Sequence, residues 1–559
     1  MSCPSSIETK KSNQVAVVHS YARRKPEETP CFQILNDHLD SFVAAREIEG
    51  RPIPKYVIDE FDPYLRCGIL AYGFLRLKCE SCSKEHVVAF SCKKRGFCPS
   101  CTAKRKIETA THLVENVLPY APYRQIVITF PISLRYWLIS NRELYSKIHA
   151  IAIKHIHRLY QDKAANQGIK NAKHGTIGFS QRWGSALNLN PHMHVLCLDA
   201  VYTALPNNLV DSDSNDYKSK NLKPILKNIE HLTDEEVAGL ITGISKSVIK
   251  LLKKRGYLDQ EGTLVENPVA DDHFEEHESH RAATAASISS KIAFGENAGK
   301  KVTRIGAGFG YEEEIPLAKG KLCYSVNGFS AHAKTRIKTN SRDKLEKLIE
   351  YMARGPISNE RLQITEQGQV KLELKRPFSD GTTHLLFTPE EFIEKLAAII
   401  PPPKTHLVRW GGVFAPSSKI RPQIILKPDA RKGFQFEKSN PQNHVQNNGI
   451  GTGQGENEAD SFGSGSDKGT DVVGSNDRAN QNPRKNSSWA RMLKKVFQID
   501  VLTCTDCQGA MKPVCAVTCH AKINRYLEHV GIAATAPPPR APPRVKARSL
   551  EFDYESHQD

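Results

Sequence analysis

The 559-residue sequence contains no run of about 18 consecutive apolar residues, which a membrane-spanning helix needs. Its first residues also lack the apolar segment of a secretory signal peptide. Both absences predict a cytoplasmic protein, whose thiols stay reduced. Acidic side chains are in deficit as well, because 61 Asp and Glu face 78 Lys and Arg, a net charge of +17. This surplus favours a polyanionic partner, either nucleic acid or an anionic membrane surface.

Composition and hydrophobic pattern divide the chain into four regions. Residues 429–488 are rich in Gly, Asn and Ser and poor in aliphatic side chains. They cannot bury enough apolar surface to offset the entropy of ordering, and so predict a disordered linker. The remaining regions are a zinc-binding module at 30–118, a large domain at 119–428 with a helical insertion at about 203–300, and a small cysteine-containing module with its tail at 489–559. Mixed strand and helix patterns in the large domain predict an α+β fold.

Ten of the 14 cysteines fall in two groups, one near each end of the chain. Disulfides are not expected in the cytoplasm, so metal binding is the better interpretation. The N-terminal group contains two CxxC pairs at zinc-ribbon spacing, which predict one closed structural zinc site. This predicted quartet is Cys79, Cys82, Cys98 and Cys101. Cys67 and Cys92 are left over and are interpreted as small core residues or as support for the ligands, although another choice of four ligands stays open.

The C-terminal group allows two interpretations. Its four thiols could close a second zinc site, or they could remain unliganded in a small hydrophobic hairpin. The group consists of Cys504, Cys507, Cys515 and Cys519. In either case we expect a small module that contacts DNA or a partner from a flexible tether.

A dense set of basic side chains surrounds the N-terminal CxxC pairs. It consists of Lys93, Lys94, Arg95, Lys104, Arg105 and Lys106. Such a set can be a solvated surface, but on a zinc module it more often contacts nucleic acid phosphates. We therefore predict a DNA-contacting patch.

His192 and His194 alternate with apolar residues in a segment that reads as a strand. Two residues of strand advance about 6.6 Å and return to the same face, so both imidazoles would project together. This geometry suits a divalent cation that holds a phosphate oxygen. The alternative is an edge strand with two exposed histidines.

Eight stretches of the chain resemble, in order, the rolling-circle transposases of the insertion-sequence ninety-one family, close to its common-region subgroup. Examples are CESCSKEHVVAFSCKKRGFCPSC, ALNLNPHMHVLCLDAVY and EYMARGPISNERL, and the full set covers residues 64–74, 79–101, 127–135, 186–202, 328–333, 350–362, 378–403 and 411–421. The resemblance implies an HUH endonuclease fold, an antiparallel sheet with flanking helices. It also implies that the N-terminal cysteines form a zinc-ribbon-like module.

By this resemblance, His192 and His194 are the metal-binding histidines of the endonuclease, with Mg²⁺ or Mn²⁺, and Tyr351 is its nucleophile. From the residues alone, a core position on a helix is the alternative for this tyrosine. Many relatives carry a second tyrosine four residues later, but this chain has Gly355 there and therefore matches the single-tyrosine branch. The third metal ligand would be Gln181 or an acidic residue that the sequence does not identify.

Two further residues lie in stretches that resemble the family. Arg354 would share a helix face with Tyr351 and could pair with a DNA phosphate or with Glu350; we predict a DNA contact. His332 lies in the matching stretch GFSAHA, and its role stays open.

The predicted function is a DNA transposase in the bacterial cytoplasm, associated with the nucleoid. It would cleave and rejoin single-stranded DNA at element ends and target sites through a 5′-phosphotyrosine intermediate, without a membrane partner. A phenol with an ordinary pKa near 10 is a weak nucleophile at neutral pH, so polarisation of the phosphate by a metal is required. The alternatives are a replication initiator or relaxase with the same chemistry, or a non-catalytic zinc-dependent DNA-binding regulator.

Overall fold

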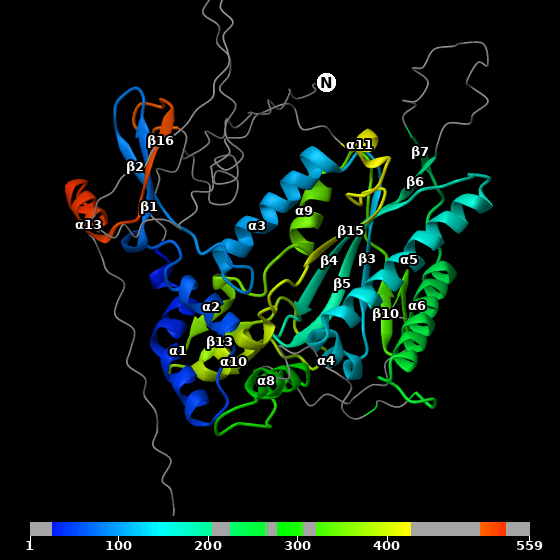
Figure 1. The fold of residues 1–559 in the computed structure, drawn as a ribbon, viewed down its shortest axis with the longest axis horizontal. Coiled ribbons are helices and arrows are strands. Elements are labelled where there is room, and N and C mark those ends of the chain that lie inside the picture. Colours follow the sequence, from blue (N-terminus) through cyan, green and yellow to red (C-terminus); the bar gives the residue numbers. More distant parts are fainter. Residues whose placement is uncertain are drawn as a thin grey trace, which may run out of the picture.

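The computed structural model describes residues 25–203, 224–262, 265, 277–305, 320–425 and 503–532. The predicted linker at 429–488 and the end of the predicted tail lie outside these described residues. A seven-stranded antiparallel sheet with helices on both faces forms the centre of the molecule, and smaller sheets surround it (Figure 1). The predicted α+β class is therefore confirmed.

The central sheet is antiparallel at every strand pairing. Its strands in spatial order are β15 (Val408–Gly412), β4 (Gly175–Trp183), β5 (Leu189–Leu198), β3 (Tyr123–Thr129), β10 (Phe329–His332) and β9 (Cys323–Val326), and the short β11 (Arg336–Ile337) also pairs with β3. Strand β3 follows from a β-branched run between Pro122 and Pro131, since proline cannot continue a central ladder. Strands β4 and β5 are buried along almost their whole length, as central strands covered on both faces must be.

Two layers of helices cover the sheet. On one face lie α4 (Ile132–Ser140), α5 (Arg142–Asn166) and α6 (Asp234–Lys254), which share an apolar core with alternate side chains of β3 and β5. On the other lie α3 (Pro99–His112), the π-helical turn η3 (Leu113–Val117) and α9 (Arg342–Met352). Helix α6, from the predicted insertion, begins at a capping box between Thr233 and Glu236. No helix among the described residues is long and apolar enough to cross a membrane.

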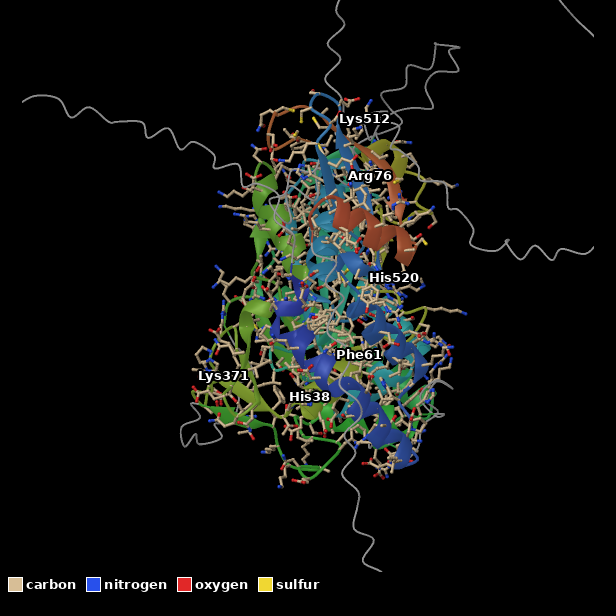
Figure 2. All side chains as sticks on the ribbon, turned by 90° about the vertical axis from the view of Figure 1, so that its left-hand side faces the viewer. His38, Phe61, Arg76, Lys371, Lys512 and His520 are labelled. Atoms are coloured by element: carbon tan, nitrogen blue, oxygen red, sulfur yellow. The ribbon has the colours of Figure 1, made fainter. Side chains whose placement is uncertain are left out.

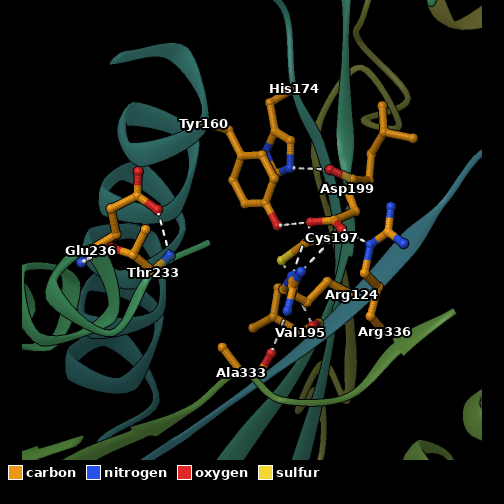
Figure 3. A network of polar contacts seen from close by, with 11 residues as sticks. Arg124, Tyr160, His174, Val195, Cys197, Asp199, Thr233, Glu236, Ala333 and Arg336 are labelled. Carbon is orange, nitrogen blue, oxygen red and sulfur yellow. Dashed lines mark hydrogen bonds and ion pairs between the residues drawn. The ribbon is translucent and has the colours of Figure 1, made fainter. Parts of the chain in front are cut away.

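A buried polar network joins one end of β5 to its neighbours (Figure 3). The Asp199 carboxylate accepts hydrogen bonds from Arg124 at 2.9 and 3.2 Å, from the Tyr160 hydroxyl at 2.9 Å and from Arg336 at 2.5 Å. Burial alone would raise the pKa of Asp199, but the hydrogen bonds and charge of Arg124 outweigh it, so the pKa is lower than usual. The satisfied network holds β3, β5, α5 and β11 in one arrangement.

A four-stranded sheet and five helical segments form a second core beside the first. The strands in spatial order are β12 (Leu362–Ile364), β13 (Val370–Glu373), β14 (His384–Phe387) and β8 (Thr303–Ile305). The helical segments are η6 (Asn359–Arg361), α1 (Pro30–Ile48), α2 (Lys55–Tyr64), α8 (Glu278–Ile288) and α10 (Pro389–Ile399). Because α1 and α2 share a core with α8 and α10, the N-terminal helices and the large domain are packed together.

A hairpin from the N-terminal region and a strand from the C-terminal region meet in a three-stranded sheet. Strand β1 (Phe74–Cys79) lies between β2 (Glu85–Ala89) and the C-terminal β16 (Met511–Val517), antiparallel to both. Helix α13 (His520–His529) follows β16 and packs beside the sheet, so the blue and red ends of the chain lie side by side (Figure 1). In the rotated view, Arg76, Lys512 and His520 mark this end of the molecule, above Phe61 and His38 (Figure 2).

The remaining elements are short. They are η1 (Pro26–Glu28), η2 (Leu70–Tyr72), the two-stranded ribbon of β6 (Ala200–Thr203) and β7 (Ile225–Asn228), and α11 (Arg421–Ile424).

Candidate functional site

The two histidines lie in the middle of the central sheet. His192 and His194 are on β5, between β4 and β3, and their Nε2 atoms are 3.1 Å apart. Their exposed fractions are only 9% and 3%. The alternative of an edge strand with two exposed histidines is therefore wrong, whereas the predicted projection from one face is what the strand produces.

Hydrogen bonds at the far ring nitrogens orient both imidazoles. The backbone carbonyl of Asn190 can only accept, so His192 Nδ1 carries the proton that it donates over 2.7 Å and His192 Nε2 keeps a free lone pair. The side-chain amide of Gln125 lies 2.7 Å from His194 Nδ1. Rotating this amide exchanges its donor for its acceptor, so it can also hold the tautomer whose Nε2 is free. Such outer hydrogen bonds are typical of metal-binding histidines.

Both rings are neutral at neutral pH, the form that binds metal. Burial, followed by the charges of His192 and Arg354, lowers the pKa of His194 to about 3. Burial also lowers the pKa of His192, and the charges of Arg354 and Arg135 add to this despite the hydrogen bond to Asn190. A pair of buried neutral imidazoles, with Nε2 atoms that face each other, suits a shared cation better than a proton.

Tyr351 lies next to this pair. Its ring centroid is 5.6 Å from that of His194, with the two planes at 85°. Helix α9 buries Leu345, Ile349 and Met352, and it leaves Tyr351 47% exposed. The alternative of a tyrosine packed in the core is therefore wrong. The hydroxyl-bearing ring is accessible from solvent and adjacent to the histidines at the same time.

Gln181 connects this helix to the sheet. Its Nε2 donates to the backbone carbonyl oxygens of Met352 at 2.8 Å and Tyr351 at 3.4 Å, and so satisfies the C-terminal end of α9. It is also the cross-strand neighbour of His192. Its Oε1 is buried and has no hydrogen-bond partner among the described residues. Since the same part of the chain shows no acidic residue that completes a three-donor cluster with the histidines, Gln181 is the better of the two predicted third ligands.

The position where relatives carry a second tyrosine has no room for a side chain. A Cβ at Gly355 would lie 2.3 Å from Oγ1 and 2.6 Å from Cβ of Thr102 on α3. The loop after α9 therefore packs directly on α3, and this contact gives a physical reason for a single tyrosine.

Arg354 lies beside Tyr351 and belongs to a group of four neighbouring cations. The Arg354 guanidinium lies 4.2 Å from the Tyr351 ring centroid. The pKa of Lys375 is lowered to about 8. Burial is the largest cause, and the charges of Arg354, Arg361 and Lys106 contribute as well. Within the described ranges, none of the four forms an ion pair with a carboxylate within 4.0 Å. We call Lys106, Arg354, Arg361 and Lys375 the cation cluster; Arg361 and Lys375 were missed by the sequence analysis because no local pattern marks them.

The other predicted DNA contacts differ in surroundings. Arg105 donates to the backbone carbonyls of Lys94 at 3.2 Å and Lys93 at 3.0 Å, so it also holds the loop before α3. Lys104 lies 3.9 Å from Glu108 on the same helix. A DNA contact by these residues and by Arg95 stays a prediction. His332 is on β10, where Val127 of β3 separates it from His194, and it is not part of the histidine pair.

The cysteines are grouped differently from the predicted quartets. One cluster joins Cys98 and Cys101 to the two leftover cysteines, Cys67 and Cys92. The predicted quartet of Cys79, Cys82, Cys98 and Cys101 is therefore wrong, and so is the interpretation of Cys67 and Cys92 as bystanders. The reason is the β1–β2 hairpin: Cys67 and Cys92 flank its base, next to the start of α3, while Cys79 and Cys82 lie at its tip, about 20 Å of strand away.

A second cluster forms at the tip of this hairpin, from Cys79, Cys82, Cys504 and Cys507. The predicted C-terminal quartet is therefore wrong as well. Cys515 lies on β16 opposite Arg76, Cys519 caps α13, and both are exposed.

The spacing of the thiols suits zinc in both clusters. Four sulfurs at about 2.3 Å from a tetrahedral zinc ion lie about 3.8 Å from one another, whereas bonded sulfurs are about 2.05 Å apart. In the first cluster, Sγ···Sγ distances are 3.7, 3.8 and 3.4 Å for Cys67–Cys101, Cys67–Cys98 and Cys92–Cys101.

Family models match the two halves of this arrangement. One, described as "Putative transposase", matches residues 175–421 and contains His192, His194 and Tyr351. Another, described as "Transposase zinc-binding domain", matches residues 34–130 and contains the Cys67 cluster. The antiparallel fold, the cysteine cluster and these matches define a transposase. The chain belongs to the transposases of the insertion-sequence ninety-one family. No curated protein and no solved structure matches it.

Proposed function

We propose that this transposase cleaves and rejoins single-stranded DNA with Tyr351 as its nucleophile. The observation that supports this most strongly is the position of the exposed tyrosine ring 5.6 Å from His194, beside two buried imidazoles whose Nε2 atoms face each other. An exposed nucleophile next to a buried metal-binding pair is the arrangement that phosphoryl transfer to a side chain requires.

His192 Nε2, His194 Nε2 and Gln181 Oε1 would hold the cation. The buried Oε1 that lacks a partner supports this set, because a buried acceptor is costly unless something binds it. Two imidazoles and one amide oxygen suit Mn²⁺ better than Mg²⁺, which prefers oxygen ligands alone. A divalent cation bound there would polarise the scissile phosphate and stabilise its developing negative charge.

The residues of this chain would carry out the transfer itself. Tyr351 Oη attacks the phosphorus, a tyrosine–phosphate bond forms, and the bond from phosphorus to the 3′ oxygen breaks. The phenol loses its proton to solvent, and the leaving 3′ oxygen gains one. The 5′ end remains on Tyr351, and one phosphate ester replaces another, so the reverse attack by a 3′-hydroxyl rejoins the strand without ATP.

The cation cluster would bind the DNA strand beside the scissile bond. Arg354 is next to the Tyr351 ring, and Arg361 and Lys375 extend the positive charge away from it. Four neighbouring cations repel one another, and that repulsion disappears when phosphates lie between them. We therefore propose single-stranded DNA as the substrate. A protein that acts on DNA in a bacterium would work in the cytoplasm, near the nucleoid.

The test is formation of a covalent protein–DNA adduct. Labelled single-stranded oligonucleotides tiled across both flanks of the gene are incubated with the protein and Mn²⁺, and adducts are resolved on a denaturing gel. We expect an adduct with the wild type and none with Tyr351→Phe. For His194→Ala we expect a rate lower by on the order of 10³-fold, since polarisation by a metal contributes several kcal/mol.

Tyr120→Phe is the matched control. Tyr120 is 62% exposed and has the Arg342 guanidinium 4.7 Å from its ring centroid, so it resembles Tyr351 in its exposure and in its cationic neighbour. The control should form the adduct at the wild-type rate. An adduct with Tyr351→Phe would refute the assignment. Sequence-specific binding without any adduct in the wild type would instead favour the non-catalytic regulator.

A further inference from the structure

The cluster at the tip of the β1–β2 hairpin joins the two ends of the chain. Cys79 and Cys82 come from the N-terminal hairpin, and Cys504 and Cys507 come from a segment beyond both family matches. Cys82 and Cys504 are 422 positions apart in the sequence, yet their Sγ atoms are 3.6 Å apart. Cys79 Sγ and Cys507 Sγ are 3.4 Å apart. These distances suit four sulfurs around one tetrahedral ion.

Each CxxC segment has the backbone shape of a metal-binding knuckle. The backbone N–H of Ser81 donates to Cys79 Sγ at 3.4 Å, and that of Gly509 donates to Cys507 Sγ at 3.4 Å. After the second cysteine of each pair, the chain turns through the left-handed region, at Ser83 with φ 60° and at Gln508 with φ 58°. Left-handed non-glycine residues are uncommon, and both knuckles place one at the same point. The N–H groups that face sulfur favour thiolate over thiol.

The two knuckles approach each other as closely as glycine allows. A Cβ at Gly509 would lie 2.5 Å from Ser81 Oγ and 3.1 Å from Cys507 Sγ. The backbone N–H of Glu80 also donates to the carbonyl of Ala510 at 2.9 Å, which continues the β1–β16 ladder into the cluster. The cluster is therefore built into the sheet and is not a chance meeting of two loops.

The rest of the C-terminal segment is held by weaker contacts. Leu70, Phe74 and Val87 form a small apolar core with Ile523 and Leu527 of α13. Ion pairs connect Lys84 with Asp506 and Lys512 with Glu80, and both are largely exposed. Even with the β1–β16 ladder, five buried apolar side chains and exposed ion pairs provide little stability for so small a unit.

We propose that Cys79, Cys82, Cys504 and Cys507 bind a second structural zinc ion, and that this ion fastens residues 503–532 to the N-terminal hairpin. We call residues 503–532 the C-terminal arm. The first cluster is complete within residues 67–101, so each chain would hold two zinc ions. One would be bound by the N-terminal region alone, and the other by both ends of the chain. The ion closes the β1–β2–β16 sheet and thereby places α13 against the hairpin, whatever the outcome for Tyr351.

The first test is the zinc content of the purified full-length chain. We expect two zinc ions per chain in the wild type and one in Cys504→Ser/Cys507→Ser. The matched control is Cys515→Ser/Cys519→Ser, which removes two exposed cysteines of the same arm that lie outside both clusters, and it should keep two. One zinc ion in the wild type, two in the Cys504→Ser/Cys507→Ser variant, or iron in place of zinc would overturn the proposal.

The second test asks whether the ion holds the arm. A protease site is inserted near residue 455, the full-length protein is cleaved under native conditions, and the fragments are separated by size. The C-terminal fragment should remain with the N-terminal part in the wild type and in Cys515→Ser/Cys519→Ser. It should separate in Cys504→Ser/Cys507→Ser, which leaves the first cluster intact. Retention in that variant would overturn the fastening role, because the apolar core alone would then suffice.

Discussion

The histidine pair and the cysteine clusters both consist of side chains that can bind metal, yet they are assembled in opposite ways. His192 and His194 are two positions apart on one strand, and the alternation of that strand is enough to bring them together. The cysteine clusters draw on a hairpin base, a helix start and, in one case, the far end of the chain. Spacing along the sequence therefore placed the two imidazoles on one face correctly and misassigned both cysteine quartets.

A local motif fixes only part of a metal site. A CxxC pair reliably brings two thiolates together, but it does not say which other pair completes the tetrahedron. The β1–β2 hairpin decides this, because its antiparallel register returns Cys92 to Cys67 at the base and leaves Cys79 and Cys82 at the tip. The two histidines are brought together by one strand alone, whereas the proposed nucleophile and the cation cluster reach them from other segments of the chain.

Mutating one cysteine in each zinc cluster should change the free energy of unfolding by very different amounts. Cys98 belongs to the main apolar core, whereas Cys504 lies at the hairpin tip. Cys98→Ser should lower the free energy of unfolding of the part outside the C-terminal arm by about 4 kcal/mol or more. The reason is that a metal and a buried ligand are lost together. Cys504→Ser should change it by less than about 0.5 kcal/mol. Scanning calorimetry of both full-length variants measures this, and equal losses would contradict the division into a core cluster and a peripheral one.

A smaller change in stability tests the contact between the loop after α9 and helix α3. Gly355→Ala would force its Cβ against Thr102 and should destabilise the protein by about 1–3 kcal/mol, because α3 and the end of α9 must separate. Gly239→Ala is the control: it lies on α6 with no atom within 4 Å of the added Cβ, and should stabilise by up to about 1 kcal/mol. Chemical denaturation of the two variants gives the comparison. Equal stabilisation by both would show that α9 and α3 do not pack as described.

The smallest effect concerns the cation cluster, which no local motif marks. Lys375→Met should weaken single-stranded DNA binding by about tenfold or less and reduce the slope of log affinity against log salt by about 0.7, the value for one phosphate contact. Lys227→Met, on β7, removes an exposed lysine elsewhere and should change neither. Fluorescence anisotropy over a salt series measures both quantities, and an unchanged slope for Lys375→Met would exclude the phosphate contact.

The same lysine gives a pH signature. Its pKa is lowered to about 8, so the free protein carries the full charge only below that pH. DNA phosphates favour the charged form, and affinity should therefore fall as the pH rises through about 8 in the wild type. The Lys375→Met variant should lack this part of the decline.

Much of the candidate site could be predicted from residues that are near one another in the sequence. The strand pattern identified β3 and β5, and the histidine spacing identified a shared face. The resemblance of residues 350–362 to the transposase family brought Tyr351 into consideration. The exposure of Tyr351 could not be predicted, because it depends on which side of α9 meets the sheet. Nor could the position of Gln181 directly opposite His192, since that depends on the pairing of β4 with β5.

The α+β class, the positive charge, the histidine pair and the presence of zinc-type cysteines can be read from the amino-acid order, because strand alternation, composition and CxxC knuckles act over a few residues. Which cysteines meet, which cations neighbour Arg354 and why Gly355 has no side chain depend on how the chain folds. Those outcomes depend on contacts between segments that are distant in the chain. The free energy that selects such contacts comes from the packing of whole strands and helices, which no short motif records.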